Sequence, residues 1–265
     1  MSKVIQYYEA YTEEIRFTRN SSKIEFLTSV KALSPQISDA SCILDVGAGT
    51  GAYSFYFAER GHQVTAIDIT PRHIDAIRQQ LASSPHELEL EARLGDATNL
   101  CDIAAESYDV VLCMGPMYHL VEESQQRKCI EECLRVLKPG GILAVAYINK
   151  LSILPMLVNK EPDFVRESVV QKILQEGTIQ SGEADCFWTD AHFATPSSIT
   201  SLLTSYAVKE VDHLGTDGVS HTISRSVDVL SEEQFQAWLL YHEATCREPS
   251  ILGLSTHGLF IGEKI

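Results

Sequence analysis

The chain lacks the features of an exported or membrane-spanning protein. Its first residues, MSKVIQYYEAYTEE, contain neither the basic stretch nor the apolar stretch of a secretory signal. No apolar run approaches the roughly 18 residues that a membrane-spanning helix needs. The seven cysteines are odd in number and never spaced as CxxC, so they predict neither a disulfide framework nor a zinc site. We therefore expect a cytoplasmic protein with no membrane partner and no metal.

Positive charge is also scarce. The 265 residues carry a formal net charge of −15, and no run of Lys and Arg overrides it. Because an acidic surface repels phosphate backbones, we expect no nucleic-acid partner. The sparse set Arg16, Arg19, Lys23 and Lys31 is interpreted as an ordinary solvated helix face. The expected partner is a small-molecule substrate, bound by a monomer or a homodimer.

What the sequence does contain is a regular alternation of strands and helices. Apolar stretches at 42–46, 63–69, 108–115 and 142–148 predict buried strands, and 87–95 alternates like a half-buried one. Near-continuous apolar strands joined by helices indicate a parallel sheet covered on both faces. Since crossovers are right-handed, we predict an α/β fold with a doubly wound Rossmann-like sheet. It is expected to be mostly parallel, with GLFIGEK as an antiparallel last strand.

The pattern changes before and after this core. One helical stretch is predicted over 4–33, with a capping box formed by Ser22 and Glu25. After the fifth strand, two short helices and a loop or edge strand interrupt the alternation. We interpret the 265 residues as a single domain with four segments. These are an N-terminal helical lid (1–38), a cofactor-binding half (39–150), a cap insertion (151–190), and C-terminal helices with the closing strands (191–265).

Three glycines follow the first predicted strand, in the stretch DVGAGTG at 45–51. Glycines at such a place let the backbone approach a ligand where a Cβ would clash. Read as G-x-G-x-x-G/A and ending at Ala52, the stretch matches the dinucleotide fingerprint. Read as D-x-G-x-G-x-G, it has an acid at the strand end and a third glycine at Gly51. The glycine spacing alone leaves both interpretations open.

Three further landmarks follow in order. Asp68 ends the second strand, GDA at 95–97 follows the third, and KPGG at 138–141 precedes the fifth. With these landmarks, residues 42–148 and the closing strands resemble the class I S-adenosylmethionine-dependent methyltransferases, in an uncharacterised small-molecule subgroup of the methyltransferase-domain type. The resemblance implies S-adenosylmethionine as the cofactor and S-adenosylhomocysteine as its product.

The resemblance also implies roles for single residues. Asp68 is expected to accept hydrogen bonds from both ribose hydroxyls, and Asp96 from the adenine amino group. Ile69 is expected to pack on the adenine face. Asp45 either takes the ammonium group of the cofactor or only orients the loop backbone. The expected cofactor-binding residues are Asp45, Gly47, Ala48, Gly49, Gly51, Asp68, Ile69, Asp96, Ala97, Met114 and Gly115.

The stretch CMGPMYHL at 113–120 ends the fourth strand, where this family meets its substrate. It departs from the N/D-P-P-Y/F motif of amino-methylating nucleic-acid enzymes at Gly115 and Met117, which removes the support for methylation of a base. Tyr118 and His119 are the candidate catalytic residues. His119 is the leading general base because its unperturbed pKa lies near neutrality. Buried structural roles are the alternative for both side chains.

Aromatic residues outside the core suggest further walls of a substrate pocket. Tyr7 and Tyr11 share one face of the predicted first helix, flanked by Tyr8, and such a helix either folds over the cofactor or simply docks through its aromatic rings. In the insertion, Trp188 and His192 either line the pocket or anchor the loop on the surface. The candidate substrate or lid residues are Tyr7, Tyr8, Tyr11, Arg16, Trp188 and His192.

The predicted activity is methyl transfer from S-adenosylmethionine to an oxygen, nitrogen or sulfur atom of a small molecule. Because the sulfonium methyl group is already activated, an in-line displacement mainly requires alignment and exclusion of water. A base is needed only when the nucleophile carries a proton. The alternatives are an RNA or protein methyltransferase and a non-catalytic module that binds S-adenosylmethionine.

Overall fold

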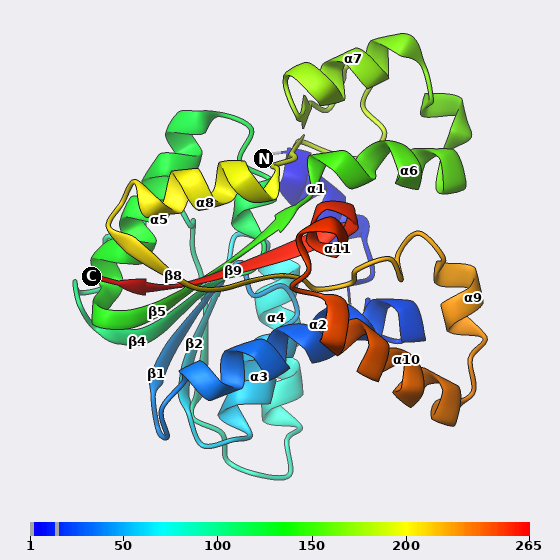
Figure 1. Cartoon of the computed structure of the whole chain (residues 1–265). Coiled ribbons are helices and arrows are strands. Elements are labelled where there is room, and N and C mark those ends of the chain that lie inside the picture. The colour runs from blue at the N-terminus through cyan, green and yellow to red at the C-terminus, as the bar shows by residue number, and fades with distance from the viewer. Residues whose placement is uncertain (1–2, 14–15) are drawn as a thin grey trace.

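A seven-stranded β-sheet runs through the centre of the molecule, which the computed structural model describes for residues 3–13 and 16–265 (Figure 1). Its strands are β1 Cys42–Val46, β2 Gln63–Asp68, β3 Leu90–Leu94, β4 Tyr108–Cys113, β5 Leu137–Ile148, β8 Val208–Gly215 and β9 His257–Lys264. They lie in the order β3-β2-β1-β4-β5-β9-β8. The order reverses beside β1, and ligands of open α/β sheets bind at such a switch point.

The strands β1 to β5 pair in parallel, whereas β9 pairs antiparallel with both β5 and β8. A parallel sheet is covered on both faces, so its strands are apolar on both. In β1, Ile43 is buried in one core cluster, and Leu44 and Val46 are buried in the other. The predicted doubly wound, mostly parallel sheet with an antiparallel last strand is confirmed.

Two layers of helices cover the sheet. The helices are α1 Lys3–Ala10, α2 Asn20–Leu33, α3 Ala52–Ala58, α4 Pro71–Ala82, α5 Glu123–Val136, α6 Lys150–Lys160, α7 Glu167–Gln175, α8 Pro196–Thr204, α9 Ser224–Asp228, α10 Glu232–Thr245 and α11 Pro249–Leu254. Apolar residues of α2, α3 and α4 pack on one face of the sheet, and those of α5 and α8 pack on the other. The sequence did not predict α9 and α11.

Local sequence signals set where several of these helices begin. Thr70 is the N-cap of α4 with Pro71 in its first turn, as the sequence predicts. Thr195 caps α8 through a capping box with Ser198. In both cases a hydroxyl residue followed by proline ends the preceding strand or loop, which places the helix directly behind the carboxyl edge of the sheet.

The N-terminal segment departs from the prediction of one helix over residues 4–33. It forms two helices, α1 and α2, and the described residues between them are not α-helical. Phe17 from this connection packs against Phe26, with ring centroids 5.4 Å apart, and against Tyr53 at 6.4 Å. These aromatic contacts hold the connection against α2 and α3.

The predicted capping box of Ser22 and Glu25 is also wrong. The second helix begins at Asn20, and Ser22 Oγ donates a hydrogen bond to the carbonyl oxygen of Arg19. Glu25 accepts instead from the guanidinium of Arg16 at 2.9 Å. An ion pair with the preceding connection therefore replaces the local capping bond that the spacing indicated.

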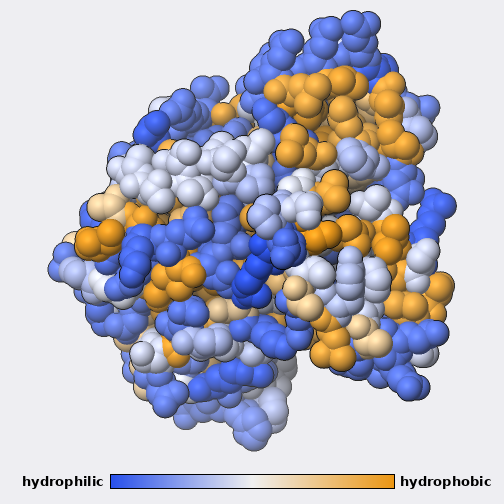
Figure 2. Space-filling model, viewed as in Figure 1, coloured by the Kyte–Doolittle hydropathy of each residue, from blue (hydrophilic) through white to orange (hydrophobic). Residues whose placement is uncertain are grey.

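An insertion follows β5, as predicted. It contains α6, α7 and a small antiparallel pair, β6 Thr178–Ile179 and β7 Ala191–His192. Ile153, Leu157 and Ile173 form a separate core there, which also packs on Tyr118. Figure 2 shows hydrophobic side chains over α6 and α7, and the exposed ones include Leu151, Val158 and Leu174. The insertion thus lies on the ligand side of the sheet (Figure 1).

Of the helices formed by residues 3–13 and 16–265, none combines the length and the apolar character needed to cross a membrane.

The close packing of β9 on β5 gives a test of the fold. A Cβ added at Gly258 would lie 2.2 Å from Cζ of Tyr147, a buried ring that is held by a 2.8 Å hydrogen bond to His213. We expect Gly258→Ala to lower the free energy of unfolding by about 2 kcal/mol or more, because the ring must shift. Gly253→Ala in α11 is the control, since nothing lies within 4 Å of its added Cβ. Urea unfolding of both variants measures the difference, and equal stabilities would contradict the packing.

Candidate functional site

The loops after β1 and β4 touch each other through glycines. Gly47 has a φ of +74°, and a Cβ there would lie 2.5 Å from Cδ of Pro116. A Cβ at Gly115 would lie 3.0 Å from the carbonyl oxygen of Gly47. Both positions therefore require glycine, for the backbone angle in one case and for the close approach in both. The contact brings the ends of two strands together beside the switch point.

Asp68 joins the first of these loops to the loop after β2. Its Oδ2 accepts from the backbone N–H of Gly49 at 2.8 Å, and its Oδ1 accepts from the N–H of Thr70 at 2.8 Å. His73 Nδ1 lies 3.2 Å from Oδ1, and because a carboxylate can only accept, Nδ1 carries the hydrogen. The buried side chain thus holds the loop after β1 and the start of α4 in place, and the crevice between the strand ends lies beside it.

The expectation that Asp68 accepts from both ribose hydroxyls stays a prediction, and these bonds limit the lone pairs left for it. A carboxylate has about four lone-pair directions, two on each oxygen. Both on Oδ1 are taken by Thr70 and His73, and one on Oδ2 by Gly49. Asp68 therefore has room for one further hydroxyl, on Oδ2.

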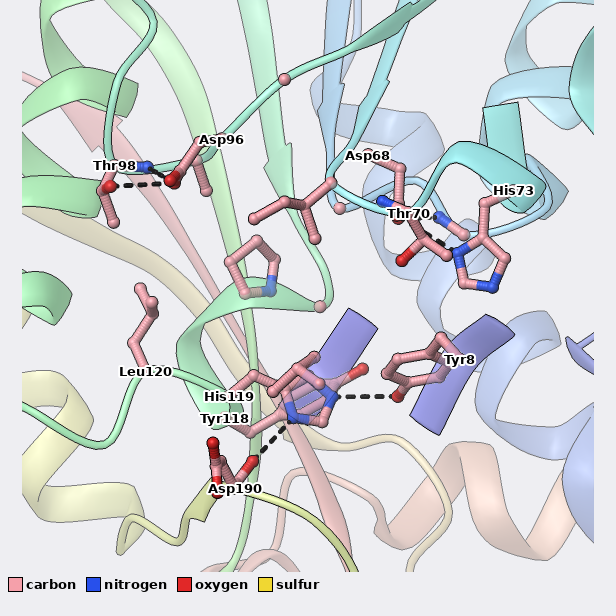
Figure 3. A pocket seen from close by; sticks show the side chains of 18 of the residues that line it. Tyr8, Asp68, Thr70, His73, Asp96, Thr98, Tyr118, His119, Leu120 and Asp190 are labelled. Carbon is pink, nitrogen blue, oxygen red and sulfur yellow. Dashed lines mark hydrogen bonds and ion pairs between the residues drawn. The ribbon is translucent and has the colours of Figure 1, made fainter. Parts of the chain in front are cut away.

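A cavity of about 350 Å³, here called the first cavity, opens at this crevice (Figure 3). The predicted cofactor residues that line it are Gly47, Gly49, Asp68, Ile69, Asp96, Ala97 and Gly115. Of the predicted catalytic and lid residues, Tyr8, Arg16, Tyr118 and His119 line it as well. The structure thus brings together residues that the sequence placed at the ends of four different strands and on the N-terminal segment.

Other predicted cofactor residues lie outside the lining. These are Asp45, Ala48, Gly51 and Met114. Met114 is buried in the core beneath the sheet. Gly51 has a φ of +88° and packs against Ile77 and Phe55, so its glycine serves the turn into α3. Ala48 donates its N–H to the carbonyl oxygen of Ile67 and holds the loop on β2.

Asp45 is completely buried behind the glycine loop. Its Oδ2 accepts a 2.6 Å hydrogen bond from Ser54 Oγ, while its Oδ1 has no partner among the described residues. Burial raises the pKa of this carboxyl to about 7, and the neighbouring charge of Asp68 adds to the effect. Asp45 therefore does not line the first cavity, and the orphaned Oδ1 marks a polar position behind the loop.

One end of the first cavity is built for a planar apolar group with polar edges. Ile69 is 39% exposed, which is unusual for a large hydrophobic side chain, and it lines the cavity. Across from it, Asp96 Oδ1 accepts from the N–H and the hydroxyl of Thr98, both at 2.8 Å. Figure 3 shows Asp96 and Thr98 on one side and Leu120 below them. The sequence did not predict Thr98, Leu120 or His73 as lining residues.

His119 forms a hydrogen-bonded chain across the other end of the cavity (Figure 3). Its Nδ1 lies 3.0 Å from the carbonyl oxygen of Asp190, so Nδ1 is the donor. Its Nε2 then accepts from the hydroxyl of Tyr8 at 2.9 Å. Burial lowers the pKa of His119 to about 4. The reason for naming it a general base, a pKa near neutrality, is therefore wrong for this arrangement.

The charges around the first cavity favour a cationic ligand. Glu13, Asp68, Asp96 and Asp190 contribute carboxylates, and Arg16 is the cation among the described lining residues. Arg16 is already paired with Glu13 at 3.2 Å and Glu25 at 2.9 Å. Carboxylates thus outnumber the cations of this lining, so the lining suits a ligand that carries positive charge.

A second cavity, of about 780 Å³, adjoins the first and shares the wall formed by Tyr8, Glu13, Arg16 and Tyr118. The lid candidates Tyr7, Tyr11 and Trp188 line this second cavity, and His192 lines neither. Tyr7 and Trp188 meet edge to face at 6.0 Å, and Tyr118 stacks near Trp188 at 6.4 Å. One side of the second cavity is thus an aromatic wall.

Another part of the lining of the second cavity is polar, and no pattern in the sequence indicated it. Glu25, Asp217 and His257 lie there, close to His221. They come from α2, from the residues after β8 and from the start of β9. Asp217 and His257 are 40 residues apart in the chain. They meet because β8 and β9 are neighbours, with Gly215 paired to Gly258.

Two clusters contain the residue types of a metal centre. Cys113, Cys129 and Cys133 are buried between β4 and α5, with the sulfurs of the first two 3.8 Å apart. Asp217, His221 and His257 form the other cluster. In that cluster the Nζ of Lys160 lies 2.8 Å from His221 Nε2, and His257 Nδ1 lies 2.8 Å from Asp217 Oδ2. The three cysteines lie together because they are buried as small apolar side chains. Hydrogen bonds explain why Asp217, His221 and His257 lie together.

Comparison with known proteins agrees with this geometry. A family described as "Methyltransferase domain" matches residues 43–141. The ubiquinone biosynthesis O-methyltransferase of Xanthomonas oryzae pv. oryzae is 33% identical over 108 residues, which cover 41% of this chain and 43% of that protein. The chain therefore matches less than half the length of this curated relative.

Solved structures extend the likeness of the fold over most of the chain. An S-adenosylmethionine-dependent methyltransferase from Methanosarcina mazei superposes with a TM-score of 0.61 at 18% identity, covering 88% of this chain and 97% of that one. A protein from Pyrococcus horikoshii OT3 gives a TM-score of 0.60 at 17% identity, covering 98% and 99%. At these identities the likeness concerns the fold.

The buried carboxyl of Asp45 yields a prediction on stability. Its pKa rises from an ordinary value of 3.8 to about 7 on folding, so ionising it costs stability increasingly as the pH rises from about 4 to above 7. Asp45→Asn removes this cost. We expect its stability relative to the native chain to improve by roughly 2–3 kcal/mol between pH 5 and pH 8.

Urea unfolding at the two pH values measures this change. Asp75→Asn is the matched control, because Asp75 on α4 has a side chain that is 65% exposed and faces Arg78 at 3.7 Å. A stability difference for Asp45→Asn that does not change with pH would contradict the raised pKa.

Proposed function

We propose that this chain, which carries a class I S-adenosylmethionine-dependent methyltransferase domain at residues 43–141, transfers a methyl group to a small molecule bound in the second cavity. The observation that carries the proposal is the pair of adjoining cavities. The first lies at the switch point of the sheet, and the second lies beyond a wall of four side chains. Direct methyl transfer requires the acceptor atom to touch the methyl carbon, so the two bound molecules have to meet at this shared boundary.

The residues of the first cavity fit S-adenosylmethionine. Gly49 leaves space beside the backbone, and Asp68 Oδ2 has a lone pair left for one ribose hydroxyl. We assign Ile69 to the adenine face and Asp96 to its amino group, with Ala97 beside the ring. The excess of carboxylates matches a sulfonium and an ammonium group better than a dinucleotide. The orphaned Oδ1 of Asp45 accords with an ammonium group reached through water.

The bound cofactor supplies an activated methyl group on a sulfonium centre. The residues of this chain then have to hold the acceptor in line and exclude water. We assign this alignment to the shared wall, where Tyr8 bonds His119 and Arg16 is fixed by two carboxylates. Tyr118 and His119 therefore act in this proposal by positioning, with His119 as a neutral acceptor for the hydroxyl of Tyr8.

Oxygen is the acceptor atom that the comparisons favour. The curated relative named above is an O-methyltransferase, although the match covers only part of it. The net charge of −15 and the excess of carboxylates in the first cavity speak against RNA as the acceptor. A module that only binds S-adenosylmethionine would have no use for a second cavity of this size beside the first. A protein acceptor is the remaining alternative.

Two further parts of the proposal concern the setting of the protein. The cysteines at the seven positions form no disulfides, which supports a reducing compartment such as the cytoplasm. The four segments of the sequence interpretation, from the lid at 1–38 to the closing strands at 191–265, are proposed to act as one domain. Both cavities draw on the N-terminal lid, the cofactor-binding half and the insertion of one chain, which accords with a monomer or a homodimer.

Cofactor binding tests the first cavity. In the native chain the N–H groups of Gly49 and Thr70 donate to the carboxylate of Asp68. Asp68→Asn places an amide N–H against at least one of these donors. We expect the Kd for S-adenosylhomocysteine to rise about 10-fold to 100-fold, as for the loss of a hydrogen bond to a charged group. Isothermal titration calorimetry measures the change. Asp75→Asn, with its exposed carboxyl, should bind like the native chain. An unchanged Kd for Asp68→Asn would remove the basis of the assignment.

Methyl transfer itself is tested with methyl-labelled S-adenosylmethionine and separate pools of small metabolites, RNA and protein. We expect the native chain to label the small-molecule pool, and Asp68→Asn to do so at least 10-fold more slowly at subsaturating cofactor. Label that appears only in RNA or protein would instead establish an alternative acceptor. Tight binding of cofactor without label in any pool would favour the binding module.

A further inference from the structure

A carboxylate and an imidazole form a pair on the polar side of the second cavity. Asp217 directly follows β8, and His257 begins β9. His257 also pairs with Ile148 at the end of β5, so both side chains lie at the carboxyl edge of the parallel strands. Nδ1 of His257 lies 2.8 Å from Oδ2 of Asp217. The pair is thus on the ligand side of the sheet, beyond the strand that borders the first cavity.

Asp217 is held rigidly. It is 1% exposed, and its Oδ1 accepts from the hydroxyl of Ser255 at 2.6 Å and from the backbone N–H of Thr256 at 2.9 Å. Burial opposes ionisation, but the charge of His257 and these hydrogen bonds outweigh it and hold the pKa of Asp217 well below its usual range. An ionised carboxylate only accepts, so Nδ1 of His257 is the donor in this pair.

The other ring nitrogen of His257 is Nε2, on a side chain that borders the second cavity. His257 lines that cavity, and its side chain is 19% exposed. Among the described residues Nε2 has no hydrogen-bond partner. It is also not one of the fully buried polar atoms that lack a partner. A histidine oriented through Nδ1 by a buried carboxylate, with Nε2 open to a substrate, has the arrangement of a general base.

His119 cannot serve in the same way. Both of its ring nitrogens are engaged, by the carbonyl oxygen of Asp190 and the hydroxyl of Tyr8. Its pKa is lowered to about 4 by burial, so it has little driving force to take a proton near neutral pH. His257 has the opposite surroundings, because carboxylates face it from two elements.

The charged groups around His257 come from several elements. Glu25 of α2 has Oε2 at 3.7 Å from Nδ1, and Asp217 lies at 2.8 Å. The ring of His221, from the same loop as Asp217, lies 5.8 Å away, and Arg16 faces the group from the connection before α2. Burial lowers the pKa of His257, but the two carboxylates outweigh it, so the pKa lies above its ordinary 6.5.

We propose that His257 is the general base for an aryl hydroxyl group held in the second cavity, with Asp217 as its positioning residue. The inference rests on the proposed function and names its substrate class. A hydroxyl group is a nucleophile that carries a proton at working pH and so benefits from a base. The aromatic wall of Tyr7, Tyr118 and Trp188, which lines the same cavity as His257, suits a planar ring.

In the balanced step, the O–H proton of the acceptor passes to Nε2 of His257. The acceptor oxygen uses the electron pair left behind to form a bond to the methyl carbon. The carbon–sulfur bond of the methyl donor breaks, and its electron pair stays on sulfur, which becomes a neutral thioether. The charge on His257 is stabilised by Asp217 and Glu25 until the proton leaves to solvent.

The first readout needs no cofactor and no activity. NMR titration of the ring of His257 in the free protein should give a pKa above 6.5. Asp217→Asn and Glu25→Gln each remove a negative charge that favours the imidazolium, so both should lower this pKa. Asp75→Asn is the charge control and should not change it. A pKa of His257 that is unaffected by Asp217→Asn would overturn the pairing on which the proposal stands.

The second readout is methylation of a panel of aryl hydroxyl compounds. The rate at saturating substrates should rise with pH through the pKa of His257, because the neutral imidazole is the base, and Asp217→Asn should move this rise to lower pH. His257→Ala should lower kcat by about 100-fold to 10,000-fold and leave the Kd of S-adenosylhomocysteine within 2-fold or so. His257→Asn keeps a donor for Asp217 and should show the same loss, which separates lost chemistry from lost folding.

His86→Ala, at an exposed position, is the control for loss of a histidine. The outcomes distinguish the two proposals. Failure of the native chain to bind the cofactor overturns the proposed function. Methyl transfer that survives His257→Ala within 3-fold or so, or cofactor binding with methyl transfer only to other acceptor classes, overturns the role of His257 alone. Stoichiometric divalent metal in the purified native protein that is lost in His257→Ala would also overturn it.

Discussion

The hydrogen bonds of one carboxylate, Asp68, hold the crevice of this molecule open in its present shape. They join the N–H of Gly49 in the loop after β1 to the N–H of Thr70 and the ring of His73 at the start of α4. A buried carboxylate costs free energy unless its oxygens are bonded, so the carboxylate and the loop geometry depend on each other. The positive φ of Gly47 and its contact with Pro116 then close the loop against the end of β4. Everything in the proposed cofactor site is arranged around this junction.

The N-terminal segment completes the site by separating two cavities. Its break between α1 and α2 places Arg16 between Glu13 and Glu25, and α1 places Tyr8 against His119. These contacts supply most of the wall that both cavities share. The same segment thus bounds the first cavity at the switch point and also forms part of the lining of the larger second cavity. A helix running unbroken through this region would hold Arg16 and Glu25, nine residues apart in the chain, too far apart to pair.

Much of the fold and of the first cavity was predictable from the sequence, because both follow from local patterns. The apolar strands, the glycines of the loop and the acids Asp68 and Asp96 at strand ends lie where periodicity and the resemblance placed them. The prediction was wrong where the role of a side chain depends on a partner that is distant in the sequence. Glu25 pairs with Arg16 rather than capping its helix, and burial against Asp190 and Tyr8 removes the basicity of His119. The pair Asp217 and His257 gave no signal at all, since only the β8–β9 neighbourhood unites them.

The central claim is that two ligands occupy two adjoining cavities, with the cofactor in the first. A crystal structure of the protein with S-adenosylhomocysteine tests it most directly. The account predicts a ribose hydroxyl on Oδ2 of Asp68, the adenine against Ile69 and near Asp96, and the sulfur at the wall of Tyr8 and Tyr118, with the second cavity left for the acceptor. Adenosine bound in the second cavity, or a ribose with no contact to Asp68, would contradict it.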